Sequence, residues 1–263
     1  MYFGLSEEQS FFKDNVKKYL GEHATIDKVK HIASGDERNI SAEIHQGLLN
    51  LGINGLLIPE EFGGLGLDLL FAAVASEALG GGVGPTPFIA PYVMAPTAIL
   101  HAGSKSQQEI YLSKIGTNEC RFGVGFSEFI GKRNDAGIIF SDNVLDGRSM
   151  FVLDAHNATH LLLADETGKI FVVEAQSPNI EIVQLTTVDK TRQYSEVICN
   201  SLEAELLERS LDSINPINKA IDAGRIMLAA DSLGASQTMI DKAVDYAKER
   251  KQFGRAIGSF QAV

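Results

Sequence analysis

The feature that most constrains the fold is a long helical pattern near the end of the chain. It begins at Pro216, a good first helical residue because the N–H that proline lacks would have no partner there, and it runs to about Lys248. Its apolar positions lie on more than one side and are Ile217, Ile221, Met227, Leu228, Leu233, Ile240 and Val244. A helix of roughly thirty residues with this pattern needs partners. The few residues after Gly254 cannot supply them, so we expect either that later helices are absent from this sequence or that another chain fills the gap.

Helical patterns also dominate the first part of the chain. Ser6 and Gln9 form a capping box, and Glu7 and Glu8 lie near the positive end of the helix dipole. Apolar residues then recur at helical spacing. Further helices are expected over residues 41–51, 69–79, 94–101 and 106–115. Residues 59–66 are rich in Pro and Gly, which predicts a loop.

Near Glu119 the pattern changes to that of strands. Phe122, Val124 and Phe126 alternate with small residues, which is the period-two signature of a strand. Residues 144–152 read as two strands joined at Asp146-Gly147, a dipeptide typical of hairpins. Further short strands are expected over 161–164, 170–174, 180–184 and 196–199, which indicates a compact antiparallel sheet or barrel.

These patterns together predict an α+β fold in three parts. We expect an N-terminal helical domain over residues 1–118 and a middle antiparallel β-domain, of barrel or sandwich type, over 119–213. Residues 214–263 would form a C-terminal helical part that consists of one long helix and a short tail, and the family resemblance given below implies that this is the start of a helical bundle.

The charge balance and the termini exclude several classes of protein. The net charge of −11 argues against nucleic-acid binding, which needs clustered Lys and Arg. No apolar run approaches the roughly 20 residues of a membrane-spanning helix, and the N-terminus lacks the basic start and apolar stretch of a secretion signal. Cys120 and Cys199 belong to no paired motif, and isolated thiols suit a reducing compartment. We therefore expect a cytoplasmic protein without a membrane span.

The histidines give no sign of a metal site. The six of them are scattered, and His156 with His160 brings no Cys or carboxylate set at zinc-ligand spacing. We interpret them as surface residues and expect no metal.

Motifs spread over the whole chain carry a resemblance to a known family. The most specific is the final stretch AKERKQFGRAIGSFQAV (247–263), and PEEFGGLGL (59–67), LDGRSMFV (145–152) and DAGR (222–225) are further matches. Together with the order helices, β-domain, helices, they resemble the acyl-CoA dehydrogenase family. Residues 80–91 are similar to the small subunits of its heteromeric members. Chains of this family continue well beyond Val263, so we expect the sequence to be C-terminally incomplete.

The resemblance implies the cofactor FAD, held partly by the tail. In the family this stretch lies across a subunit interface and contacts the flavin dinucleotide of a neighbouring subunit. Arg250 would pair with its pyrophosphate, a task suited to a planar guanidinium, and Gln252 and Phe253 would contact the same cofactor. The alternative interpretation of this stretch is an ordinary charged helix end that is exposed to solvent and binds no cofactor.

Residues of the β-domain would complete the implied flavin site. Phe126 and Ser127 match positions that line the flavin ring, and Phe151 matches an aromatic position packed beside it. The alternating apolar residues here are equally typical of a β-domain core that contacts no cofactor. The family's Ser or Thr that bonds the hydride-accepting nitrogen is replaced by Leu153, and its Gly-Ser-Asp loop is replaced by residues 129–135.

The resemblance also implies the reaction. The family oxidises an acyl-CoA to a 2,3-enoyl-CoA and passes electrons to an electron-transfer flavoprotein or a similar acceptor. Asp222 and Arg225 match positions that touch the CoA moiety, although as ordinary charges on a helix surface they need no such role. The family's base is a Glu either at the position of Gly224 or near the far C-terminus, so no catalytic residue can be named.

Two functions remain open. The first is an FAD-dependent acyl-CoA dehydrogenase that works as a homo- or hetero-oligomer, a dimer or a tetramer. The second is a non-catalytic structural subunit of a heteromeric member, which would help to hold the FAD of its partner. The altered flavin loop, Leu153 and the lack of a visible base favour the second.

Overall fold

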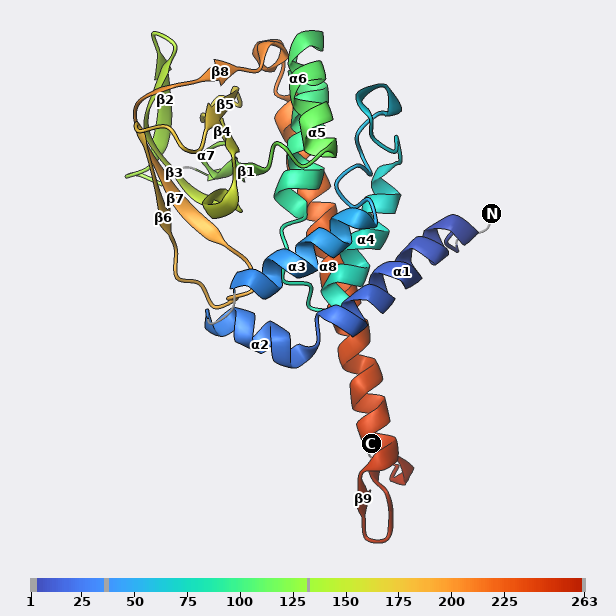
Figure 1. Ribbon diagram of the computed structural model, residues 1–263. Coiled ribbons are helices and arrows are strands. Elements are labelled where there is room, and N and C mark those ends of the chain that lie inside the picture. The colour runs from blue at the N-terminus through green and yellow to red at the C-terminus, as the bar shows by residue number, and fades with distance from the viewer. Residues whose placement is uncertain (1–3, 36–37, 132, 262–263) are drawn as a thin grey trace.

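The computed structural model describes residues 4–35, 38–131 and 133–261, and begins with a group of helices (Figure 1). Their bounds are α1 (Glu7–His23), α2 (Ile26–Ser34), α3 (Arg38–Asn50), α4 (Leu69–Gly81), α5 (Ala95–Ala102) and α6 (Lys105–Gly116). A π-helical turn, η2 (Ala90–Met94), continues directly into α5. The helices expected from the sequence are confirmed with slightly different ends, whereas α2 lies in a stretch for which the sequence predicts none.

The predicted capping box at the start of α1 is confirmed. The Gln9 backbone N–H donates to Ser6 Oγ at 3.1 Å, and the Ser6 N–H donates to Gln9 Oε1 at 2.9 Å. Two of the helix's orphan donors are thereby satisfied. The helix buries Val16 and Leu20 against the rest of the helical group.

The middle part is an eight-stranded mixed sheet within the described residues. Its strands are β1 (Phe122–Gly125), β2 (Gly137–Ser141), β3 (Val144–Leu153), β4 (His160–Ala164), β5 (Ile170–Glu174), β6 (Ile180–Gln184), β7 (Tyr194–Glu203) and β8 (Glu205–Leu206). The order is β6-β7-β3-β1-β4-β5-β8, with β2 paired to β3. Every pair is antiparallel except β1 with β4. A short helix, α7 (Ser127–Gly131), follows β1.

The prediction of a hairpin turn at Asp146-Gly147 is wrong. The turn lies earlier, at Asp142 and Asn143, which both have positive φ (51° and 64°) and join β2 to β3. Asp146 and Gly147 lie within β3, where the register with β7 shifts between Leu145 and Gly147. Gly147 has φ 109°, and Asp146 accepts a hydrogen bond from the Ser201 N–H at 2.7 Å. The dipeptide therefore lies opposite a bulge whose extra residue belongs to β7, where Ser201 has φ 49°. The positive φ of Gly147 needs the same backbone freedom as a turn.

The predicted long helix is confirmed as α8 (Asn215–Glu249), 35 residues in one piece with Pro216 in its first turn. Its first half packs against α4, α5 and η2. The approach to α4 is close, because a Cβ on Gly234 would overlap the carbonyl oxygen of Glu77 and a Cβ on Gly80 would overlap that of Asp231. Glycine at these positions allows the two backbones to touch.

The second half of α8 projects from the body of the molecule, as the red end of the ribbon in Figure 1 shows. The Thr238 hydroxyl donates to the carbonyl of Gly81 at 3.0 Å, near the point where α8 leaves the body. Beyond it the apolar side chains of Met239, Ile240, Val244 and Tyr246 are exposed. The expectation that this helix needs more cover than the chain supplies therefore agrees with the structure.

Two apolar cores hold the described residues together. The larger contains the helices, one face of the sheet and the first half of α8, and the smaller lies on the other face of the sheet. Both cysteines are buried and free. No helix among residues 4–35, 38–131 and 133–261 is long and apolar enough to span a membrane.

Candidate functional site

The predicted tail residues meet at the tip of α8. There β9 (Lys251–Gln252) pairs with β10 (Arg255–Ala256) around Phe253 and Gly254, whose φ values are 51° and 80°. A two-residue turn with positive φ at both positions fits a tight hairpin, but phenylalanine is unusual in that conformation. The Phe253 side chain is 94% exposed, and Arg250 and Gln252 are exposed as well. An aromatic ring held in the open by the backbone is suited to contact with another molecule.

The predicted sheet residues lie around the ends of β1 and β3. Phe126 is only 3% exposed, so a contact with a cofactor there would have to come from its backbone. The Ser127 hydroxyl reaches the Met150 carbonyl and, at 3.2 Å, the carboxylate of the buried Glu128. Its one hydrogen is therefore committed inside the protein, and the hydroxyl could serve a ligand only as an acceptor.

Phe151 is the predicted sheet residue best placed to meet a ligand. It has φ 55° and its side chain is 52% exposed. The register of β3 against β7 shifts between Ser149 and Val152, so Phe151 belongs to a second bulge. Bulges of this kind redirect a side chain away from the regular pleat. Leu153, two residues later, is partly buried against the larger core.

The tail group and the sheet group lie apart within one chain. In Figure 1 the β9–β10 hairpin stands at the far end of α8, while β1 and β3 lie beside the first half of that helix. A single copy therefore cannot use both groups on one ligand. The assignments to a flavin stay predictions, and they require two chains.

Asp222 and Arg225 lie on the exposed side of α8. They pair with each other at 3.0 Å, and both side chains are more than half exposed. Gly224 between them faces the opposite way, into the core, where a Cβ would be 2.8 Å from Met94 Sδ. The space beside Gly224 is thus filled by a side chain of η2.

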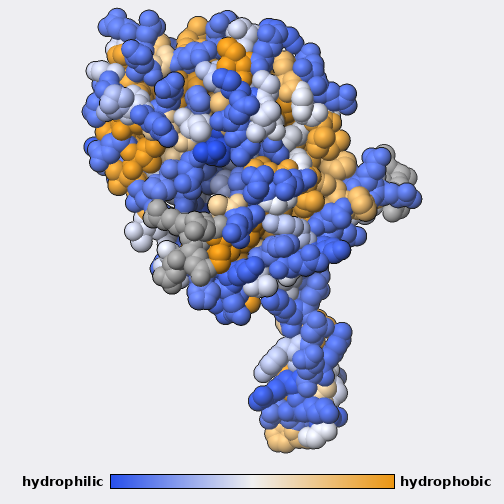
Figure 2. Space-filling model, viewed as in Figure 1, coloured by the Kyte–Doolittle hydropathy of each residue, from blue (hydrophilic) through white to orange (hydrophobic). Residues whose placement is uncertain are grey.

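A large cleft lies between the helical part and the sheet. It has a volume of about 800 Å³, which is in the range of small-molecule sites. Its walls come from the end of α2, the start of α3, the segment 85–92, residues 118–121 and 154–157, and the loop 184–193. Figure 2 shows the corresponding hollow, rimmed mainly by hydrophilic side chains.

A chain of buried hydrogen bonds forms one wall of this cleft. Tyr92, 1% exposed, donates from Oη to Asn118 Oδ1 at 3.1 Å. Tyr92 Oη therefore accepts from His45 Nε2 at 2.9 Å, which leaves His45 Nδ1 to accept from the Thr86 hydroxyl at 2.5 Å. Burial, aided by the nearby Arg121 charge, lowers the pKa of His45 to about 4. The imidazole is neutral at physiological pH.

Charged side chains gather at the sheet side of the cleft. Burial raises the pKa of Asp154 to about 6, against the opposing effect of Arg192. Arg192 in turn pairs with Asp231 of α8 at 2.6 Å. Asp154 has φ 55° and accepts no hydrogen bond from the described residues. The position immediately after Leu153 is thus occupied by a partly buried carboxylate whose pKa is raised.

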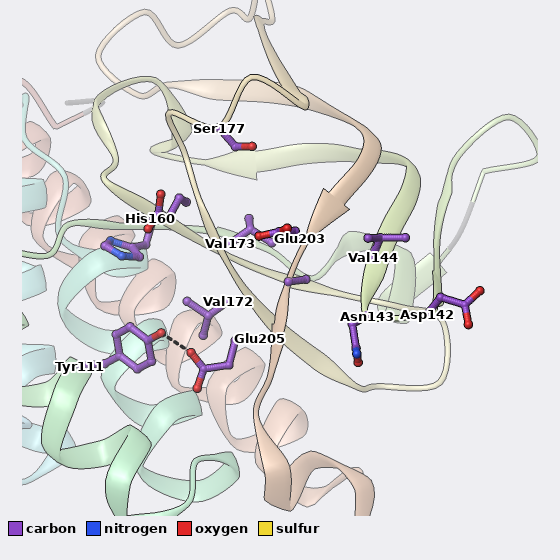
Figure 3. Close-up of a pocket in the computed structure, with 12 residues that line it drawn as sticks. Tyr111, Asp142, Asn143, Val144, His160, Val172, Val173, Ser177, Glu203 and Glu205 are labelled. Carbon is purple, nitrogen blue, oxygen red and sulfur yellow. Dashed lines mark hydrogen bonds between the residues drawn. The ribbon is translucent and has the colours of Figure 1, made fainter.

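A second cavity, of about 560 Å³, lies between α6 and the sheet. Figure 3 shows Tyr111 donating to Glu205 across it, at 2.5 Å, with His160 beside them and Glu203 farther along. Four carboxylates line the cavity, those of Asp142, Glu174, Glu203 and Glu205. None of the predicted site residues lies there.

The interpretation of all six histidines as surface residues is wrong for three of them. His45, His101 and His160 are partly buried, and desolvation lowers the pKa of each. No local pattern indicates the burial of these three side chains, because the residues that cover them come from distant segments. No group of side chains suited to a metal ion occurs among residues 4–35, 38–131 and 133–261.

Comparisons with known proteins identify relatives over the whole chain. The family model described as acyl-CoA dehydrogenase, N-terminal domain, matches residues 6–119, and that of the C-terminal domain matches 214–263. A probable acyl-CoA dehydrogenase of Bacillus subtilis, YngJ, is 27% identical over 100% of this chain and 74% of its own. The caffeyl-CoA reductase-Etf complex subunit CarC of Acetobacterium woodii is 26% identical over 100% and 74%.

A solved structure of similar fold is that of glutaryl-coenzyme A dehydrogenase in complex with glutaryl-CoA. It superposes with a TM-score of 0.85 at 22% identity, covering 100% of this chain and 72% of that one.

Proposed function

Because the chain belongs to the acyl-CoA dehydrogenase family, we propose that it takes part in the FAD-dependent oxidation of an acyl-CoA to a 2,3-enoyl-CoA. FAD would supply the acceptor for the hydride, and the protein would position the cofactor and the thioester. The observation that carries the proposal is the β9–β10 hairpin, which presents Arg250, Gln252 and Phe253 outward at the end of a projecting helix.

The described side chains fit this cofactor in part. The exposed Arg250 guanidinium suits a pyrophosphate, and the exposed Phe253 ring suits a flat heterocycle. On the sheet, Phe151 is free to pack beside a flavin ring, but the Ser127 hydroxyl hydrogen is already engaged. The tail of one subunit and the sheet of another would together hold each cofactor.

The proposal implies partners as well as a cofactor. The substrate would be an acyl-CoA, with Asp222 and Arg225 near its CoA portion. Electrons would pass to an electron-transfer flavoprotein or a similar acceptor, in keeping with the name of the relative CarC. The exposed apolar side chains of the second half of α8 support an oligomer, either a dimer or a tetramer, made of like or unlike subunits.

A second function is favoured by the contact between Gly224 and Met94. A side chain at the position of Gly224 would require the Met94 side chain to move, and the Leu153 side chain offers no hydrogen bond at the neighbouring sheet position. The chain would then be a structural subunit of a heteromer that lends its tail to the cofactor of a catalytic partner.

The visible absorption spectrum of the purified protein separates these functions. A bound yellow chromophore that an acyl-CoA bleaches supports the enzyme. Colourless protein that gains flavin only after mixing with a partner chain supports the structural subunit. Protein that holds no flavin in either state refutes both.

A variant pair then tests the tail itself. Arg250→Gln combined with Phe253→Ala should reduce the flavin retained by the assembly at least tenfold, because the pair removes the proposed contacts with the pyrophosphate and the ring. Both side chains are exposed and contribute little to the fold, so unfolding would not account for the loss. The control is Lys18→Gln on the exposed side of α1, which should retain flavin fully. Equal retention by the two variants would contradict the role of the tail.

A further inference from the structure

The cleft between the helical part and the sheet concentrates positive charge on a chain of net charge −11. Among the residues that the structure describes, its lining includes three cations, Arg121, Lys190 and Arg192, and one carboxylate, that of Asp154. Arg192 already pairs with Asp231, but neither Arg121 nor Lys190 has an ion pair with any residue that the structure describes. A concave site lined by one sign of charge attracts ligands of the opposite sign.

Arg121 holds the central position among these cations. Its Nε donates to the backbone carbonyl of Asn157 at 3.0 Å, which fixes the guanidinium while its terminal nitrogens have no hydrogen-bond partner among the described residues. The side chain is close enough to the buried wall to influence the pKa of both His45 and Tyr92. A guanidinium fixed in this way can offer two parallel N–H donors to a carboxylate or a phosphate.

The hydrogen-bonded wall near Arg121 does not neutralise its charge. His45 is uncharged because its pKa is about 4, and Tyr92 stays protonated because burial raises its pKa. Asn118 and Thr86 are neutral and are engaged in the hydrogen-bonded chain with His45 and Tyr92. The cleft therefore combines an anchored cation with a neutral polar wall, a combination suited to an anionic group.

We propose that this cleft binds an oxyanion of the substrate, a carboxylate or a phosphate group, with Arg121 as its principal contact. The proposal rests on the proposed function, because Asp154 and the 85–92 segment connect the cleft to the predicted reaction site. Asp154 follows Leu153 directly, and the segment continues into η2, whose Met94 touches Gly224. An acyl group that ends in a carboxylate could extend from there to Arg121, and a phosphate of CoA offers the same chemistry.

Binding of matched thioesters by isothermal titration calorimetry tests this assignment. Glutaryl-CoA and pentanoyl-CoA share a five-carbon chain and differ in the terminal carboxylate, while CoA and dephospho-CoA differ in one phosphate. We expect the anionic member of one pair to bind at least tenfold more tightly than its partner compound. The pair that shows the difference identifies the source of the oxyanion.

Substitutions of Arg121 then show whether the difference in affinity depends on this side chain. Arg121→Gln should abolish the tighter binding of the anionic compound. Arg121→Lys, which keeps the charge but loses the paired donors, should keep part of this difference in affinity. Arg209→Gln, an exposed arginine that does not line the cleft, is the control and should leave the advantage intact. Circular dichroism of each variant verifies that it is folded.

Several outcomes overturn the proposal. It is refuted if neither pair differs, or if the advantage survives in Arg121→Gln; binding of all the thioesters would still leave the proposed function standing. If no CoA compound binds, the proposed role as an acyl-CoA-oxidising enzyme fails. In that case the binding of glutarate and of inorganic phosphate is measured directly. Binding to the natural chain that is lost in Arg121→Gln supports the anion site, and the absence of binding refutes it.

Discussion

Replacing Asp154 by Asn should stabilise the protein at neutral pH. Asp154 has φ 55°, a conformation that Asn adopts as readily as Asp, so the backbone is not strained by the change. The substitution keeps the shape of the side chain and removes its charge. What it eliminates is a partly buried carboxylate beside the cleft, which accepts no hydrogen bond from the described residues.

The size of the effect follows from the pKa. Burial raises the pKa of Asp154 from 3.8 to about 6, with Arg192 opposing the rise. Folding therefore disfavours the ionised form, and the cost is absent below the unfolded pKa and complete above the folded one. A shift of about two units corresponds to about 3 kcal/mol of unfolding free energy. Stability of the natural chain should fall as pH rises through 4 to 6, and that of Asp154→Asn should not show this decrease.

Urea unfolding followed by circular dichroism measures the difference. Near neutral pH the variant should be more stable by about 2–3 kcal/mol, and the gain should shrink to about 1 kcal/mol near pH 4.5. Asp142→Asn is the matched control, because Asp142 also has positive φ but is exposed in the β2–β3 turn. The control should change stability by less than about 0.5 kcal/mol at either pH. A variant that is less stable than the natural chain at neutral pH, or a gain that does not depend on pH, would refute the reasoning.

Two further predictions concern the packing of α8. Gly234→Ala should destabilise the chain by about 1–3 kcal/mol in urea unfolding, because the new methyl group overlaps backbone of α4. By contrast, Gly21→Ala, in an open part of α1, should stabilise it by about 0.5–1 kcal/mol; equal effects would show that α4 and α8 are not in close contact. A double-mutant cycle of Arg192→Met and Asp231→Ala should give a coupling of about 1–2 kcal/mol across their 2.6 Å ion pair, and additive effects would exclude the link between the sheet and α8.

The sequence predicted the helices well because their determinants are local. The capping box of Ser6 and Gln9, the Pro216 start and the apolar periodicity of α8 all act within a few turns of chain. Most strand positions were also predictable, since β5 and β6 have the expected bounds. Local signals that agree with one another leave few alternatives.

The error at Asp146-Gly147 has a physical reason. Both this dipeptide and Asp142-Asn143 supply residues that tolerate positive φ, and a sequence window cannot distinguish a turn from a strand position with positive φ that faces a bulge of the neighbouring strand. The decision is made by β7, which pairs with β3 on both sides of Gly147 and keeps the chain extended there. A strand more than forty residues away thus determines what a local signal means.

The candidate site shows the same division between local and distant determinants. The tail residues could be identified because they lie in one continuous motif, whereas the walls of the cleft come from segments near residues 45, 92, 121, 154 and 190 that no spacing rule connects. The neutral state of His45 depends on burial by those segments, so its role in the cleft was invisible in the sequence. The proposed flavin site, made from the tail of one chain and the sheet of another, could be predicted even less directly, because half of its determinants would belong to a second copy or a relative. The exposed Phe253, held at positive φ on a projecting helix, is the local feature that supports such a shared site.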